Sequence, residues 1–218
     1  VDIIDQLTYN YASNSNTLIK VTDVADNAGF KDVNTTENDY MYDVNGNMTS
    51  DLNKGITPNG ITYNHLNLPT LINFGDQGSI SYIYDATGVK QAKIVDNNSS
   101  LTKSLYADNF IYQVNHSNIE KLIFINQSEG YVEPENNGDF IYRFQFKDHL
   151  GNIRITYSDL DFDGSINPPT EIIEESNYYP FGLKHKGYNN IISVIDYPYG
   201  FEEQEEENEF GLNWISFK

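Results

Sequence analysis

The 218-residue chain has no cysteine, which excludes disulfides and thiol nucleophiles. It also lacks a long apolar run. The longest runs, such as LIFI at 122–125, are only strand-sized, whereas a membrane-spanning helix needs about 20 apolar residues. We therefore expect a soluble or secreted protein without membrane insertion.

Basic residues are scarce. The chain has 13 Lys and Arg against 32 Asp and Glu, which gives a formal net charge of −19. Because affinity for nucleic acids comes from clustered Lys and Arg, we expect no nucleic-acid partner.

Catalytic signatures are missing as well. The sequence has no G-x-S-x-G elbow, no phosphate-binding glycine loop and no His-Glu-x-x-His zinc motif. The four histidines, His65, His116, His149 and His185, form no cluster with a second type of metal ligand. We expect His149 to be structural, through a hydrogen bond within its turn, and His185 to lie on the surface of a basic loop. The sequence predicts no enzyme activity, no catalytic residue and no certain cofactor.

Aromatic and turn-forming residues are abundant. The chain has 17 Tyr and 12 Phe, together with many Asn, Asp and Gly residues. Aromatic residues favour strands, and Asn, Asp and Gly accept the positive φ angles of tight turns. This combination predicts many short β-hairpins.

One phrase returns at a fixed period. YDVNGNMT at 42–49 is followed by YNHLNLPT at 63–70 and YDATGVKQ at 84–91, so that Tyr42, Tyr63 and Tyr84 are spaced by 21 residues. Gly46, Asn67 and Gly88 each lie four residues after the tyrosine. A fixed period indicates repeated structural units. We expect each unit to be a hairpin whose tyrosine stacks on the next and keeps its hydroxyl near a backbone partner or water.

A later segment shows clear strand alternation. In FIYRFQFK at 140–147, four aromatic residues fall on one face, and Ile141, Arg143, Gln145 and Lys147 fall on the other. The aromatic face fits core packing or, alternatively, a sugar-binding platform, and the alternation favours packing. Overall we expect an all-β array of antiparallel hairpins forming a curved sheet.

The remaining segments are predicted as loops and an acidic tail. We expect exposed loops at 132–139 and 166–171, because both contain proline. Six of the eight residues at 202–209 are Glu, so a solvated loop, a frayed helical turn or disorder is expected there. The apolar end could dock as a strand through Trp214 and Phe217. This organisation predicts a hairpin domain at 1–200 and an acidic segment with an apolar end at 201–218.

The repeated phrases resemble a known family. YDVNGNMT, YDATGVKQAKIV, KDHLGNIRITYSD and NYYPFGLKHKGYN are similar to the YD-repeat or RHS family, in particular to the RHS-repeat-associated core of Bacteroidota. The resemblance covers most of residues 5–190. It implies a ribbon of hairpins that spirals into a hollow shell, which in RHS proteins commonly encloses a C-terminal toxin. It also implies export, often by the type 9 route.

The resemblance implies a structural function. We expect a shell segment of a secreted or cell-surface protein that encloses or presents a C-terminal cargo or toxin absent from this chain, with protein partners such as the remaining shell, the cargo or the secretion machinery. The alternative is a carbohydrate- or cation-binding adhesion module. A self-cleaving toxin precursor is a third interpretation, for which the cleavage aspartates of the family are not found here.

One acidic loop is a candidate calcium site. Asp159, Asp161, Asp163 and Gly164 match the start of a calcium-binding loop, in which oxygens at positions 1, 3 and 5 converge. Position 12 is Thr170 instead of Glu, and the nearest Glu is Glu171. The alternative is a hairpin with an Asp-Gly turn and solvated carboxylates.

Overall fold

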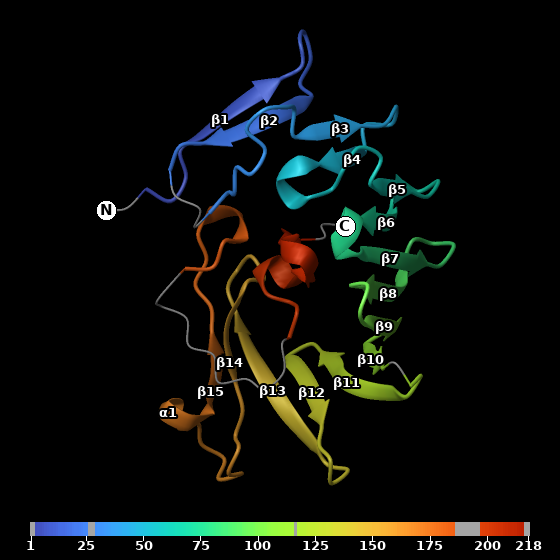
Figure 1. Cartoon of the computed structure of the whole chain (residues 1–218). Helices are drawn as coiled ribbons and strands as arrows, with labels where there is room; N and C mark the ends of the chain where they lie inside the picture. The colour runs from blue at the N-terminus through green and yellow to red at the C-terminus, as the bar shows by residue number, and fades with distance from the viewer. Residues whose placement is uncertain (1–2, 26–28, 116, 186–196, 216–218) are drawn as a thin grey trace. The chain divides into compact units, whose positions relative to one another are not determined.

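The computed structural model describes residues 3–25, 29–115, 117–185 and 197–215 (Figure 1). Strands β5 to β15 follow one another in chain order through an antiparallel sheet of 11 strands, and β1–β2, β3–β4 and β16–β17 form two-stranded sheets. This confirms the all-β hairpin array. Among the described residues, no helix has the length and apolar character needed to cross a membrane.

The chain forms two compact units, which are described separately. Unit 1 contains residues 1–104 and 115–118, and unit 2 contains residues 105–114 and 119–218. The expected domain boundary between residues 200 and 201 stays a prediction.

Unit 1 is a series of short hairpins, visible in Figure 1 from β1 to β8. Its elements are β1 (Leu7–Tyr11), β2 (Leu18–Asp23), β3 (Tyr40–Tyr42), β4 (Met48–Asp51), η1 (Leu52–Lys54), β5 (Ile61–Tyr63), β6 (Pro69–Asn73), η2 (Gly75–Gln77), β7 (Ser79–Tyr84) and β8 (Lys90–Asp96). Strand β9 (Leu101–Ala107) contains residues of both units. The buried hydrophobic residues of unit 1 are Val21, Ile56, Ile61, Ile72, Phe74, Ile80, Tyr82 and Ala92.

Unit 2 contains six further strands of the long sheet. They are β10 (Phe110–Val114), β11 (Glu120–Gln127), β12 (Gly130–Pro134), β13 (Phe140–Lys147), β14 (Ile153–Tyr157) and β15 (Ile172–Glu175). Short elements complete the unit: α1 (Pro168–Glu171), η3 (Pro180–Gly182), η4 (Phe201–Glu203), β16 (Glu206–Glu207), η5 (Glu209–Gly211) and β17 (Trp214–Ile215). Its buried cluster contains Ile111, Phe124 and Tyr131, with Tyr106, Ile123, Tyr197 and Tyr199 packed against it.

The two predicted loops contain regular structure. Residues 132–134 belong to β12, and only 135–139 form the turn. The segment expected as a loop at 166–171 contains the one-turn helix α1, with Pro168 and Pro169 at its first positions. Proline suits these positions because the first N–H groups of a helix have no intrahelical partner.

The face of β13 that is buried differs from the expectation. Its four aromatic side chains are exposed, up to 62% for Phe146, whereas Arg143 and Gln145 are only 8% and 9% exposed. Core packing of the aromatic face was therefore the wrong expectation. Alternation defines two faces of a strand, but which face turns inward depends on what the rest of the chain packs against it.

Contrary to the expectation, the acidic segment is not fully solvated. Glu206 and Glu207 pair with Ile215 and Trp214 as β16 and β17, and Glu207 is only 2% exposed. The docking of the apolar end as a strand is confirmed for Trp214, and Phe217 lies outside the described residues.

Candidate functional site: hairpin-linking tyrosines and two surface features

The residue after Tyr42 organises the turn of its hairpin. Asp43 closes a five-residue turn, in which its N–H donates to the carbonyl oxygen of Asn47 at 2.8 Å and its own carbonyl oxygen accepts from the N–H of Gly46 at 3.1 Å. Its carboxylate Oδ1 accepts from the N–H groups of Asn45 and Asn47, both at 2.9 Å. Gly46 has a φ of 85°, which glycine adopts without steric cost. The Tyr-Asp-x-x-Gly phrase is therefore a turn signal with a physical cause.

Three other turns repeat this geometry. In each, an Asp or Asn accepts the same pair of backbone N–H groups with its Oδ1 atom, and the fourth residue has a positive φ. The turns are 64–68 and 85–89 in unit 1 and 148–152 in unit 2. Their positive-φ residues are Asn67, Gly88 and Gly151. Gly46 and Gly88 thus have the positive φ angles expected of left-handed turn positions.

Two of the three repeat tyrosines, Tyr42 and Tyr63, connect consecutive hairpins through their hydroxyl groups. Tyr42 Oη donates to the carbonyl oxygen of Leu18 at 2.8 Å, and Tyr63 Oη donates to that of Met48 at 2.6 Å. Leu18 and Met48 each directly follow the turn of the preceding hairpin. In both cases, the tyrosine before one turn binds the backbone carbonyl after the previous turn.

Unit 2 contains a third link of this kind. Tyr178 Oη donates to the carbonyl oxygen of Ile153 at 3.2 Å, and Ile153 directly follows the turn at 148–152. Tyr178 itself precedes a turn, in which the N–H of Tyr179 donates to the carbonyl oxygen of Leu183 and Gly182 has a φ of 91°. Tyr178 is not among the repeat tyrosines predicted from the 21-residue period. The signal was present, because glycine lies four residues after Tyr178 as it does after Tyr42.

The links of Tyr42 and Tyr63 join hairpins that do not pair with each other through their strands. The β1–β2 and β3–β4 hairpins are separate two-stranded sheets, and the next hairpin begins with β5 in the long sheet. Between β2 and the next hairpin, the buried Asp39 adds two bonds: its N–H donates to the Ile19 carbonyl oxygen at 2.8 Å, and its Oδ2 accepts from the Val21 N–H at 2.7 Å. Side chains thus replace the missing backbone ladder.

The hydroxyl groups of the linking tyrosines are held in their neutral donor form. Burial, assisted by the nearby Asp43 carboxylate, raises the pKa of Tyr63 to about 12. Burial also raises the pKa of Tyr42. A neutral hydroxyl that donates to a carbonyl contributes about 0.5–1.5 kcal/mol to stability.

Stacking between successive repeat tyrosines stays a prediction. The ring contact described for Tyr84 joins it to Tyr82 on the same strand, with ring centroids 6.2 Å apart and ring planes at 32°. The hydroxyl groups of Tyr42 and Tyr63 do have the backbone partners that were expected for them.

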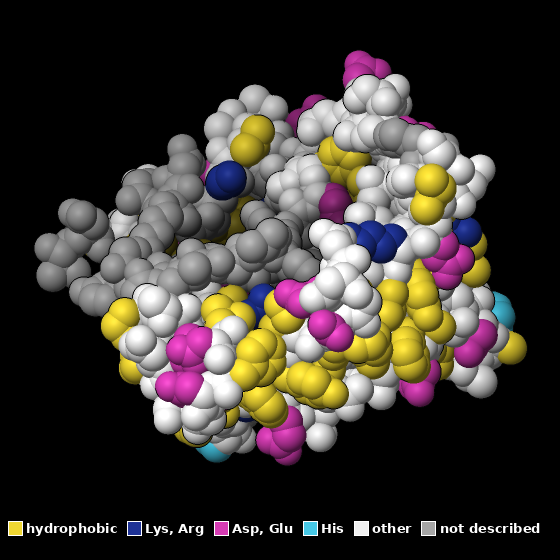
Figure 2. All heavy atoms as spheres, turned by 90° about the horizontal axis from the view of Figure 1, so that it is seen from below, with side chains coloured by type: hydrophobic (Ala, Val, Ile, Leu, Met, Phe, Trp, Pro, Cys, Tyr) yellow, Lys and Arg dark blue, Asp and Glu magenta, His cyan; other side chains and the backbone are white. Residues whose placement is uncertain are grey.

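Three of the four exposed aromatic residues of β13, Phe140, Tyr142 and Phe144, border a surface groove in unit 2. Tyr142 stacks on Phe144 with ring centroids 6.5 Å apart, and Phe144 stacks on Tyr157 at 5.7 Å. The groove has a volume of about 430 Å³ and is also lined by Ile125, Gln127, Ser128, Glu129, Gly130 and Val132. Figure 2 shows one face of the molecule with hydrophobic side chains gathered in a band and Asp and Glu side chains beside them.

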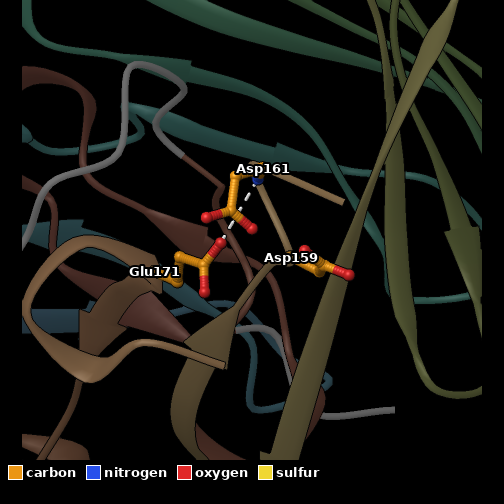
Figure 3. A group of neighbouring side chains, drawn as sticks. All are labelled: Asp159, Asp161 and Glu171. Carbon is orange, nitrogen blue, oxygen red and sulfur yellow. Dashed lines mark hydrogen bonds between the residues drawn. The ribbon is translucent and has the colours of Figure 1, made fainter. Parts of the chain in front are cut away.

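The acidic loop brings two of the three predicted aspartates together with a glutamate. Carboxylate oxygens of Asp159, Asp161 and Glu171 lie within 4.8 Å of one another, and Asp163 is not part of this group. Figure 3 shows Asp161 beside Glu171, with the hydrogen bond from the Asp161 N–H to the Glu171 carboxylate. Asp163 instead accepts from the N–H of Ser165 at 2.7 Å.

Glu171 already organises this loop through its hydrogen bonds. Its carboxylate accepts from the N–H of Asn167 at 2.6 Å and of Leu160 at 2.7 Å, besides that of Asp161. These bonds, that from Asn167 first, lower the pKa of Glu171 and keep it ionised. Carboxylate oxygens are the ligands that calcium prefers, so this group is the one described set of side chains suited to hold such an ion.

The histidines do not join this group. His149 is exposed, and the hydrogen bonds of its turn come from Asp148. His185 is half-buried, and its ring lies 3.8 Å from that of Tyr179, centroid to centroid. His116 lies outside the described residues.

Comparison with known proteins gives a fold likeness alone. No protein-family model and no curated protein matches the chain. Among solved structures, a chain of the crystal structure of TcdB2-TccC3-Cdc42 matches with a TM-score of 0.56 and 15% identity over 94% of this chain. TcdB2-TccC3 without its hypervariable C-terminal region and TcdB2-TccC3 itself each match with a TM-score of 0.54 and 14% identity over 94% of this chain. The chain spans 11% of the length of each of these solved chains.

Proposed function

We propose that the chain is a structural segment of an RHS-like hairpin scaffold in a secreted or cell-surface protein, without turnover of its own. The observation that carries this proposal is the repeated link from a tyrosine hydroxyl to the carbonyl after the previous turn. A connection repeated from hairpin to hairpin suits an extended wall, in which each unit is stabilised by its neighbours. The fold likeness to TcdB2-TccC3 chains and the YD-type phrases support the same role.

The scaffold would enclose or present a cargo. RHS-like shells commonly surround a C-terminal toxin, so the proposed partners are the rest of the shell, the cargo and the export machinery. The resemblance to Bacteroidota proteins makes the type 9 route the proposed route of export.

The native mass of the protein tests this proposal. We expect the protein to be recovered outside the producing cells, within an assembly whose mass exceeds the 24.9 kDa of this chain. Size-exclusion chromatography with mass spectrometry of the native material measures this directly. A free monomer of that mass, retained inside the cells, would contradict the proposal.

A second candidate function, carbohydrate binding, is favoured by the groove along β13. Its volume falls within the range of small-ligand pockets, about 300–1,000 Å³. Tyr142 and Phe144 supply ring faces, and Gln127, Ser128 and Glu129 supply hydrogen-bonding groups for sugar hydroxyls. Glycan-array binding tests this function: Tyr142→Ala should abolish binding, and Phe162→Ala, exposed and outside the groove lining, should not. An array on which no glycan is retained would rule it out.

Calcium binding is the other part of this second candidate. We propose that Asp159, Asp161 and Glu171 hold the ion, with Asp163 outside its ligand set. Calorimetric titration with Ca²⁺ should give heat that Asp161→Asn removes and Asp163→Asn preserves. The absence of heat with the unmodified protein would contradict it.

A further inference from the structure

Tyr11 occupies the same position as the linking tyrosines. It directly precedes a turn, in which the N–H of Ala12 donates to the carbonyl oxygen of Thr17 at 2.9 Å, and it pairs with Leu18, the residue after that turn. A β-bulge precedes it on the strand, between Asn10 and Tyr11. Tyr42 has the same surroundings, because it pairs with Met48 and a bulge lies between Met41 and Tyr42.

Tyr11 differs in what its hydroxyl contacts. Tyr42 and Tyr63 bind the carbonyl after the preceding turn, whereas Tyr11 Oη has no hydrogen bond to any residue that the structure describes. Its side chain is 55% exposed. The hydroxyl is therefore available to an acceptor from outside the described part of the chain.

The strand that carries Tyr11 is also open. Four of the five residues of β1 are exposed, and β2 is the only strand with which β1 pairs among the described residues. An exposed strand edge is a ready binding surface for another β-element.

We propose that the exposed side of β1 binds a β-hairpin of a separate partner polypeptide, and that the carbonyl after the partner's turn accepts a hydrogen bond from Tyr11 Oη. The inference rests on the proposed scaffold function and names the chemistry of one of its partners. The links of Tyr42 and Tyr63 define this chemistry, because the proposed contact continues an interface that is repeated within unit 1. The β1 strand would thus recognise the partner by the geometry of its hairpin turn and by the backbone carbonyl that follows this turn.

The experiment supplies such a hairpin covalently. A copy of residues 39–60 is fused ahead of the full chain through a glycine-serine linker, which gives the copy a high effective concentration at β1. The first measurement is nitration of Tyr11 by tetranitromethane, followed by mass spectrometry. We expect docking to lower nitration of Tyr11 several-fold, and the same fusion with Gly46→Val in the copy alone to leave nitration unchanged.

The second measurement isolates the hydroxyl. Tyr11→Phe should lower the thermal midpoint of the fused protein by about 2–4 °C, the shift expected for loss of one hydrogen bond in a protein of this size. In the chain without the copy, the same substitution should leave the midpoint unchanged within error. A second fusion, with residues 61–78 as the copy, covers the case in which the first copy does not fold.

Three results would overturn the inference. Unchanged nitration of Tyr11 in both fusions would exclude hairpin docking at β1. Equal effects of Tyr11→Phe with and without the copy would exclude the hydroxyl link. Dimerisation of the unextended chain that Tyr11→Phe abolishes would assign the hairpin to a second copy in place of a separate partner. The native-mass measurement tests the scaffold proposal independently of all three.

Discussion

Both units contain the tyrosine hydroxyl link, and unit 2 also uses tyrosines from distant parts of the chain to build its core. In unit 1, half-buried tyrosines at a fixed period reach from one short hairpin to the backbone of the one before it. In unit 2, tyrosines from distant parts of the chain build the core: Tyr197 stacks on Tyr131 with ring centroids 4.0 Å apart, and Phe124 packs against both. The periodic tyrosines thus link successive hairpins. The tyrosines without a fixed period bring distant parts of the chain together in one hydrophobic cluster.

The units also differ in how polar groups are buried. Unit 2 buries an ion pair between Arg143 Nη2 and Glu133 Oε2 at 3.1 Å. Among the described residues, Arg143 Nε and Nη1 and Glu133 Oε1 have no hydrogen-bond partner. In unit 1, Asp39 and Asp51 are buried with backbone N–H groups as donors. Backbone donors thus hold these two buried carboxylates of unit 1, whereas a charged side chain faces the buried carboxylate of unit 2.

The largest expected effect contrasts two aromatic residues of unit 2. Phe124 is buried in the cluster and Phe146 is exposed on β13. Phe124→Ala should lower the free energy of unfolding by about 3–5 kcal/mol, and Phe146→Ala should change it by less than about 1 kcal/mol. Urea unfolding followed by the fluorescence of Trp214, the single tryptophan and a residue of unit 2, measures both. A larger effect at Phe146 would mean that β13 buries its aromatic face after all.

The buried ion pair gives the next largest effect. Glu133→Leu should cost about 3 kcal/mol, because it leaves the Arg143 guanidinium buried without its counter-ion. The double variant Glu133→Leu with Arg143→Met should recover most of the loss, which the same urea titrations would detect. A double variant as unstable as the single one would show that the pair itself stabilises unit 2.

Asp51 gives unit 1 a pH-dependent stability. Burial raises its pKa from 3.8 to about 6, so the folded state favours the protonated form. The resulting stabilisation is present below about pH 4 and is lost as the pH rises through about 6. At pH 7, Asp51→Asn, which keeps an acceptor for the N–H groups of Asn53 and Lys54, should be more stable by about 1–3 kcal/mol.

Denaturation of Asp51→Asn and the unmodified protein at several pH values checks this difference. The two stabilities should converge below about pH 4. A difference that is constant with pH would contradict the assignment to ionisation of Asp51.

The turns of unit 1 should respond to backbone conformation. Gly46→Val should cost about 1–2 kcal/mol, because a β-branched residue is disfavoured at a φ of 85°. Gly46→Asn is the matched control, since Asn67 occupies the equivalent position with a φ of 58°. Hydrogen exchange of the amides of β3 and β4 measures both. Equal protection in the two variants would exclude backbone strain as the cause.

The sequence predicted the repeating parts of this molecule well. The spacing of Tyr42, Tyr63 and Tyr84 and the positions of Gly46 and Gly88 identified hairpins and their left-handed turn residues, because both properties depend on neighbours along the chain. The acceptor of each tyrosine hydroxyl could not be predicted, since it lies on the backbone of another hairpin.

Unit 2 was less predictable for the same reason. On β13, Arg143 is buried and its aromatic neighbours are exposed, and Glu207 is buried although it lies in an acidic run. Both outcomes depend on contacts with segments that are distant in the sequence. The grouping of Glu171 with Asp159 and Asp161 depends on the one-turn helix α1, whose residues were expected to form a loop.

The hydroxyl link between hairpins is tested most directly by removing one oxygen atom. Tyr63→Phe should lower the free energy of opening of unit 1 by about 1 kcal/mol, since it leaves the Met48 carbonyl without its donor. Tyr9→Phe is the control, because Tyr9 is exposed and its hydroxyl makes no hydrogen bond within the described ranges. We predict that hydrogen exchange of the β4 and β5 amides accelerates in Tyr63→Phe and not in Tyr9→Phe. Identical exchange in the two variants would contradict the account.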